Sequence, residues 1–169
     1  VGGVALFSAN RNFNNDASAP RQVAELNNAL QTTAFHTNGL PLFVAIDHEG
    51  DDYPYSRLTN SVTPVPSQMA LGATWNLGYT EAIGQIVGQE MSAMGINMIL
   101  GPTVDVLNDP RSTGRGDIGT RVYGGDPFWV SQMGRAYIRG IHSGSNGRMI
   151  TVAKHFPGHG GSDRLPDNE

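Results

Sequence analysis

The sequence predicts an α/β fold in which parallel strands alternate with helices. Four short apolar runs lack polar alternation, which is typical of strands buried on both faces of a sheet. Between them lie three longer segments with apolar residues at helical spacing, and parallel strands need such crossovers. The 22 glycines and 10 prolines fall mainly between these segments and mark their ends.

The expected strands are rich in Val, Ile and Phe and too short to be helices. They occupy residues 4–7, 42–46, 96–100 and 149–153. With a helix between each pair, the order is β-α-β-α-β-α-β within one domain covering residues 1–169. A closed eight-stranded barrel takes about 250 residues, so four strands predict an open sheet or half of such a barrel. Either arrangement leaves two unpaired sheet edges.

The expected helices have recognisable starts and ends. Each start carries a candidate capping residue, a proline or both: Ser18 with Pro20, Thr80 with Glu81, and Asp126 with Pro127. Each end carries a glycine: Gly39, Gly95 and Gly144. An additional short helix is expected around residues 67–72.

Composition excludes several classes of partner and site. The formal net charge is −4 and Lys and Arg do not cluster, so we expect no nucleic-acid partner and no anionic membrane surface. No apolar run approaches the roughly 20 residues of a membrane helix. The absence of cysteine excludes disulfides and thiolate metal sites and leaves the cellular compartment open. No phosphate-binding loop is present, and no cofactor is expected.

Polar side chains follow each expected strand, where ligands of parallel α/β folds bind. In chain order the residues at these strand ends are Ser8, Asn10 and Arg11; Asp47, His48, Glu49 and Gly50; Asp105; and Lys154 with His155. Because the carboxyl ends of parallel strands meet at one edge, these groups are expected to form one rim.

Several of these residues allow two interpretations from the sequence. Asp47 can accept hydrogen bonds from sugar hydroxyls or cap the following turn. Lys154 can hold a ligand or form an internal ion pair with Asp105 or Asp47. Residues 101–125 form a long loop typical of binding function, in which Arg121 can reach the rim or pair on the surface. The surface partners considered for Arg121 are Asp117 and Asp126.

A cluster of acidic residues and a pair of histidines are each only a weak indication of metal binding. Glu49, Asp51 and Asp52 are interpreted as a solvated acidic turn with no assigned role. His155 and His159 have the four-residue spacing of zinc ligands, but Pro157 and Gly158 lie between them and oppose a helix. We therefore expect no metal site.

Taken together, the motifs resemble the N-terminal barrel of glycoside hydrolase family 3, most closely its β-N-acetylglucosaminidase branch. The matching blocks occur in family order at residues 2–10, 46–50, 95–106, 121–127 and 154–160. The most specific block reads Lys154-His155-Phe156-Pro157-Gly158-His159-Gly160. The resemblance implies a (β/α) barrel of the TIM type, of which this chain contains about half.

The resemblance also implies which residues hold the sugar. Asp47, Arg121, Lys154 and His155 would bind the hydroxyls of the terminal sugar, with Arg57, Asp105 and His159 as further candidates. Arg57 matches an arginine after the Asp-x-Glu-Gly block, although residues 51–56 are longer and more acidic than usual. The implied activity is removal of terminal β-linked N-acetylglucosamine by a retaining mechanism.

The catalytic groups themselves are not assignable in this chain. The family nucleophile belongs to a later strand, which is expected beyond Glu169, and the Asp-Ser-His acid/base element of the branch has no match in residues 161–169. The chain alone is therefore expected to be inactive, with the missing barrel half or a second copy covering its sheet edges. The alternatives are a β-glucosidase of the same family and a non-catalytic sugar-binding or structural remnant.

Overall fold

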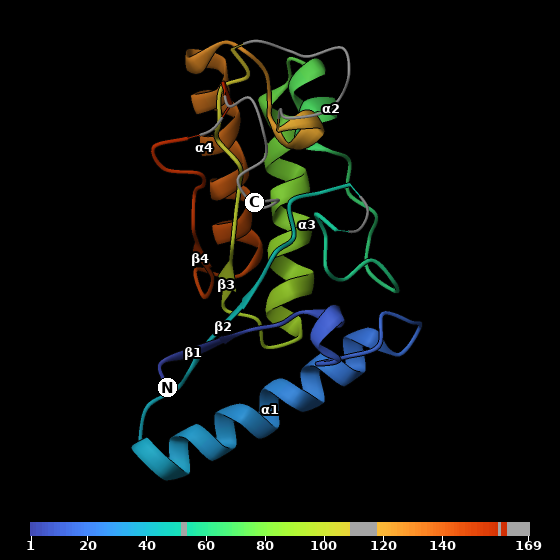
Figure 1. Ribbon diagram of the computed structural model, residues 1–169, viewed down its shortest axis with the longest axis vertical. Helices are drawn as coiled ribbons and strands as arrows, with labels where there is room; N and C mark the ends of the chain where they lie inside the picture. The colour runs from blue at the N-terminus through green and yellow to red at the C-terminus, as the bar shows by residue number, and fades with distance from the viewer. Residues whose placement is uncertain (52–53, 109–117, 159, 162–169) are drawn as a thin grey trace.

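The sheet consists of parallel strands that neighbour one another in chain order (Figure 1). Within residues 1–51, 54–108, 118–158 and 160–161, which the computed structural model describes, it has four strands. These are β1 (Gly3–Ala5), β2 (Phe43–Ile46), β3 (Met98–Ile99) and β4 (Ile150–Thr151). Val4 pairs with Val44, Ile46 with Ile99, and Ile99 with Thr151. The predicted α/β partial barrel and its four strand positions are confirmed, with shorter strands than expected.

Burial within the sheet increases from its edges to its centre. Val44 and Ile46 of β2 are fully buried, whereas Ile150 of the edge strand β4 is 43% exposed. The prediction that all four strands are buried on both faces is therefore wrong for β1 and β4. In the described part of the chain, each of these strands has a neighbour on one side only, so one flank stays uncovered.

Helices follow each of the first three strands. They are α1 (Ala19–Asn38), α2 (Gln68–Ala73), α3 (Leu77–Ala93) and α4 (Pro127–Gly144), with short 3₁₀ helices η1 (Ser8–Asn10) and η2 (Gly119–Arg121). Figure 1 shows α3 and α4 side by side, and α1 lying across the opposite end of the molecule near β1. The core lies between sheet and helices, where Met91 of α3 and Met133 of α4 are fully buried. None of the described helices is both long and apolar enough to span a bilayer.

The contact between α3 and α4 depends on small residues. A Cβ added at Gly88 would meet the carbonyl oxygen of Ile141, and one added at Gly140 would meet that of Glu81. The glycines therefore let the two helix backbones approach more closely than ordinary side chains permit.

The predicted helix boundaries are largely confirmed. Ser67 caps α2 by accepting from the Ala70 amide, and Asp126 caps α4 by accepting from the Trp129 amide. The predicted start of α3 at Thr80 is wrong, because Asn76 caps a helix that begins at Leu77. The Thr80 hydroxyl instead faces α4 and lies 3.1 Å from the Met133 sulfur.

Candidate functional site

A cavity of about 640 Å³ opens at the carboxyl ends of the strands. It is lined by residues from every strand end and from η2: Phe7, Asp47, Glu49, Pro54, Tyr55, Arg57, Leu100, Arg121, Val152, Lys154 and His155. Apolar side chains thus form part of its wall, and charged side chains form the remainder. We refer to it below as the rim cavity.

Lys154 joins the carboxylates that follow β2. Its Nζ lies 2.9 Å from Asp47 Oδ1 and 2.5 Å from Glu49 Oε1. Two backbone features fix this geometry: Asp47 comes directly after β2, and Lys154 pairs with Thr103 in a bridge beyond β4. The side chains of Asp47 and Lys154 remain 15% and 18% exposed, so a ligand in the cavity can reach them.

Glu49 is the most deeply buried carboxylate of the rim cavity, with its side chain 3% exposed. Arg121 donates to both of its oxygens, over 2.7 and 2.9 Å, and Thr103 donates over 3.2 Å. Burial alone would raise the pKa of Glu49, but the hydrogen bond from Arg121 and the charges of Lys154 and Arg121 hold that pKa below its ordinary value. Glu49 is therefore an ionised structural anchor at neutral pH.

The interpretation of Glu49, Asp51 and Asp52 as a solvated acidic turn is thus wrong for Glu49. Asp51 is exposed, as expected, and Asp52 lies outside the described residues. The segment after β2 is extended, so Asp47 and Glu49 face one side and His48 the other. This period of two is the sequence signal that could have placed Glu49 beside Asp47.

Arg57 adds a second cation beside Asp47. Its Nε lies 3.7 Å from Asp47 Oδ2, and its guanidinium carbon lies 5.1 Å from the centre of the Phe7 ring. Its backbone amide also donates to the Asp47 carbonyl over 3.1 Å. The loop after residue 51 therefore returns Arg57 to the rim despite its unusual length.

His155 is oriented by a buried carboxylate. Asp105 Oδ2 lies 2.7 Å from the ring Nδ1 of His155 and accepts from its backbone amide over 3.0 Å. The Asp105 side chain is fully buried, whereas that of His155 is 25% exposed and lines the rim cavity. Asp105 thus lies behind the cavity and fixes the imidazole that faces it.

Part of the predicted rim is brought together, whereas His48 faces the opposite side of its segment and Asp105 lies behind the cavity. Asp47, Arg57, Arg121, Lys154 and His155 line one cavity. The first strand contributes Phe7 to that lining, and the expected Ser8, Asn10 and Arg11 are not among the lining residues. His159 lies outside the described residues, as do Arg111 and Arg115 of the long loop.

The ion-pair alternatives are also resolved by the geometry. Lys154 pairs with Asp47, whereas Asp105 pairs with His155. Of the two alternatives for Arg121, the surface pairing with Asp126 is wrong, because Asp126 caps α4 and Arg121 is buried against Glu49. Asp117 lies outside the described residues.

The rim cavity combines carboxylate acceptors with ammonium, guanidinium and imidazole groups beside apolar walls. Such an arrangement suits a ligand whose hydroxyls both donate and accept hydrogen bonds. A group of three or more His, Asp or Glu side chains able to hold a metal ion is not found among the described residues.

Comparison with known proteins gives one consistent result. The family described as "Glycosyl hydrolase family 3 N terminal domain" matches residues 1–167. Beta-hexosaminidase A of Pseudoalteromonas piscicida is 33% identical over 95% of this chain and 25% of its own length. A beta-hexosaminidase of Chromobacterium violaceum is 32% identical over 95% of this chain and 41% of its own length.

Two solved structures extend the similarity to three dimensions. A family 3 β-N-acetylglucosaminidase from Paenibacillus sp. FPU-7 is 38% identical with a TM-score of 0.81, covering 95% of this chain and 28% of that one. NagZ from Neisseria gonorrhoeae, in complex with N-trifluoroacetyl-D-glucosamine, is 28% identical with a TM-score of 0.76 over 95% and 44% of the two chains. The chain thus spans between 25% and 44% of the length of these relatives.

Proposed function

Since the chain belongs to the N-terminal domain family of glycosyl hydrolase family 3, we propose that it supplies the sugar-holding part of a hydrolase. The substrate is a glycoside with a terminal, non-reducing β-linked N-acetylglucosamine, and the bond is cleaved by a retaining mechanism. The observation that carries this proposal is the Asp47–Lys154–Glu49 cluster at the open end of the sheet.

In this proposal Asp47 and Lys154 bind the sugar directly. Asp47 has two acceptor oxygens at the cavity and can bind two neighbouring hydroxyls. Lys154 forms an ion pair with this carboxylate and offers the remaining ammonium proton to a hydroxyl oxygen. His155, held by Asp105, offers its second ring nitrogen to the same ligand.

Arg121 has a mainly structural role in the site, in contrast to Asp47 and Lys154. Two of its donors bind Glu49, and its guanidinium carbon lies 5.2 Å from the centre of the Tyr55 ring. It therefore fixes Glu49, which in turn fixes Lys154. Arg57 contributes positive charge on the other side of Asp47.

The retaining mechanism needs a carboxylate nucleophile and a general acid/base, which we assign to no described residue of this chain. The size of the relatives supports the proposal that the sugar-holding residues and the catalytic groups lie in different parts of the enzyme, because the chain corresponds to 28% of the Paenibacillus enzyme and 44% of NagZ. We expect the 169-residue chain to bind the sugar and to show no turnover on its own.

Binding by the 169-residue chain tests the proposal directly. Titration with N-acetylglucosamine, followed by two-dimensional NMR, should give saturable shifts around residues 47 and 154. Asp47→Asn should weaken binding at least tenfold, which corresponds to about 1.4 kcal/mol. Glu25→Gln, on the exposed surface of α1, is the matched control and should bind as the parent chain does.

Three outcomes would contradict the proposal in different ways. A folded chain without saturable sugar binding would indicate a structural remnant. Tighter binding of glucose than of N-acetylglucosamine would favour a β-glucosidase. Release of nitrophenol from a chromogenic N-acetylglucosaminide, lost in Lys154→Ala, would show that the chain is active by itself.

A further inference from the structure

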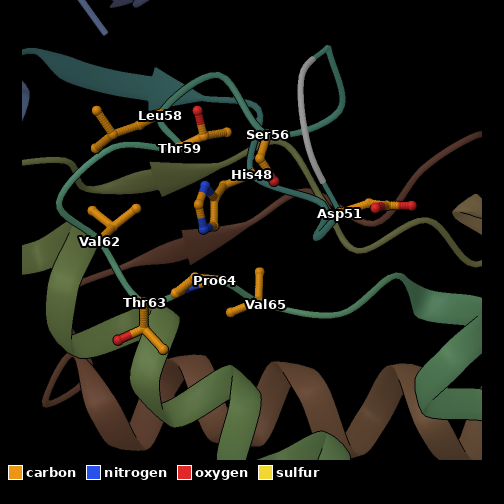
Figure 2. Close-up of a pocket in the computed structure, with 9 residues that line it drawn as sticks. All are labelled: His48, Asp51, Ser56, Leu58, Thr59, Val62, Thr63, Pro64 and Val65. Atoms are coloured by element: carbon orange, nitrogen blue, oxygen red, sulfur yellow. The ribbon is translucent and has the colours of Figure 1, made fainter. Parts of the chain in front are cut away.

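A second cavity, of about 320 Å³, lies on the opposite side of the segment that carries Asp47 and Glu49. Figure 2 shows the residues that line it: His48, Asp51, Ser56, Leu58, Thr59, Val62, Thr63, Pro64 and Val65. None of them lines the rim cavity. We refer to it as the His48 cavity.

Two buried polar groups of this cavity lack partners. His48 is 2% exposed and Ser56 is 1% exposed. Within the described residues, neither ring nitrogen of His48 has a hydrogen-bond partner, and nor does the Ser56 hydroxyl. Figure 2 shows the imidazole in the middle of the lining side chains, between the segment with Ser56 and that with Pro64. Buried polar groups of this kind are costly unless something binds them.

The backbone around the cavity is held firmly. The amide of Asp51 donates to Val65 over 2.9 Å, and the amide of Glu49 donates to Tyr55 over 3.2 Å. His48 also pairs with Ser56 in an antiparallel bridge. The two walls are therefore fixed relative to each other, as in a preformed ligand site.

The chemistry of the lining favours a neutral ligand with hydroxyl groups. Burial lowers the pKa of His48 to about 4, against a smaller opposing effect of Glu90, so the imidazole is neutral at pH 7. A neutral imidazole has one donor and one acceptor nitrogen, and two hydroxyl groups of one ligand can satisfy them, because a hydroxyl both donates and accepts. Leu58, Val62 and Val65 provide apolar contacts for the carbon face of such a ligand. An anion would be repelled by Asp51.

We propose that the His48 cavity is a second binding site for a neutral polyol of monosaccharide size, with His48 and Ser56 as its buried polar contacts. The site is separate from the rim cavity and does not rest on the function proposed above. Because His48 lies between Asp47 and Glu49 in the chain, its occupant contacts the reverse side of the segment that forms the rim.

The test follows the ring nitrogens of His48 by NMR in the chain labelled with ¹⁵N-histidine. The probes are glucose, N-acetylglucosamine and glycerol, added to the Asp47→Asn variant so that binding at the rim cavity is weakened. We expect saturable ¹⁵N shifts with a dissociation constant in the millimolar range for at least one sugar. Weaker binding at the rim should leave the response of the His48 ring nitrogens intact.

Two variants assign the response to the cavity. Val62→Trp places a larger side chain in the lining and should abolish the shifts, and Ser56→Ala should weaken binding at least fivefold. Asn28→Trp, on the exposed face of α1, is the matched control and should leave the shifts unchanged. Amide spectra of each variant establish that it is folded.

Several results would overturn the proposal. One is the absence of saturable shifts with all three probes up to about 0.1 M in the folded chain. Another is a response that survives Val62→Trp. A water resonance in contact with the His48 ring, without any response to the probes, would show a hydrated cavity only. A response to protonated glucosamine but not to glucose would show that the site selects cations.

Discussion

The Lys154 ammonium lies 2.9 Å from an oxygen of Asp47, although 107 residues separate the two in the chain. The contact links the ends of β2 and β4, which are not neighbours in the sheet because β3 lies between them. The contact therefore depends on the correct placement of β2, β3 and β4 in the sheet. The pair is both a fold contact and the centre of the proposed sugar site.

A double-mutant cycle should show coupling between these two residues. Lys154→Met and Asp47→Asn each remove one charge. The change in the free energy of unfolding of the double mutant should differ from the sum of the two single-mutant changes by about 0.5–3 kcal/mol. Urea unfolding of the parent chain, the two single mutants and the double mutant measures this difference. The pair Arg139 and Glu81, at an exposed position, is the control, for which we expect a coupling within about 1 kcal/mol. Equal coupling in both pairs would contradict a special role for the partly buried contact.

Arg121 should not tolerate replacement by lysine. Arg121→Lys keeps the charge but loses the two-pronged contact with Glu49, and the buried carboxylate is left partly unpaired. We expect the free energy of unfolding to fall by about 2–4 kcal/mol, measured by urea unfolding at pH 7. Arg135→Lys, on the exposed side of α4, should change it by less than about 0.5 kcal/mol. An equally small effect at Arg121 would mean that the pair adds little to folding.

The sequence was sufficient to predict the sheet and its helices because local patterns determine them. Runs such as residues 42–46 are continuously apolar, and α4 begins with Asp126 as N-cap and Pro127 as its first residue. Burial at the sheet edges was not predictable in the same way, since it depends on whether another strand pairs with β1 or β4. The start of α3 was misplaced because Gly78, a poor helix former, lies in its first turn.

Several residues that line the rim cavity were predictable from the sequence, but Glu49 and the ion pairs of the cavity were not. Asp47 and Lys154 follow apolar strands, so the topology alone brings them to one rim. Glu49 was misinterpreted because three acidic residues in four positions suggest solvent, and only the tertiary position of Arg121 makes its burial favourable. The pairing of His155 with Asp105 likewise depends on the geometry of the loops after β3 and β4, which the sequence pattern does not determine.

The α3–α4 interface should be sensitive to a single added methyl group. Gly88→Ala places a Cβ against the Ile141 carbonyl of α4, and the helices must move apart to accept it. We expect the free energy of unfolding to fall by about 1–3 kcal/mol despite the better helix propensity of alanine. Thermal unfolding followed by circular dichroism measures the loss. Gln89→Ala, at the next position and exposed, should be neutral or slightly stabilising. A more stable Gly88→Ala chain would contradict the close helix contact.

The buried His48 should make the protein less stable as the pH falls from about 6.5 to about 4. Burial lowers its pKa to about 4 in the folded chain, from 6.5 in the unfolded chain. Between these values the unfolded chain binds the extra proton, so the free energy of unfolding rises with pH and levels off above 6.5. The contribution is about 3 kcal/mol across this window. Glu49 also lowers the stability as the pH falls, but in a lower pH range, since its stabilising effect is lost as the pH falls through a folded-state pKa below 4.5.

Urea unfolding between pH 4 and 8 should therefore give a flatter profile of stability against pH for His48→Gln than for the parent chain. His36→Gln, at an exposed position of α1, should leave the slope unchanged. A parental slope retained in His48→Gln would show that another group titrates in this range.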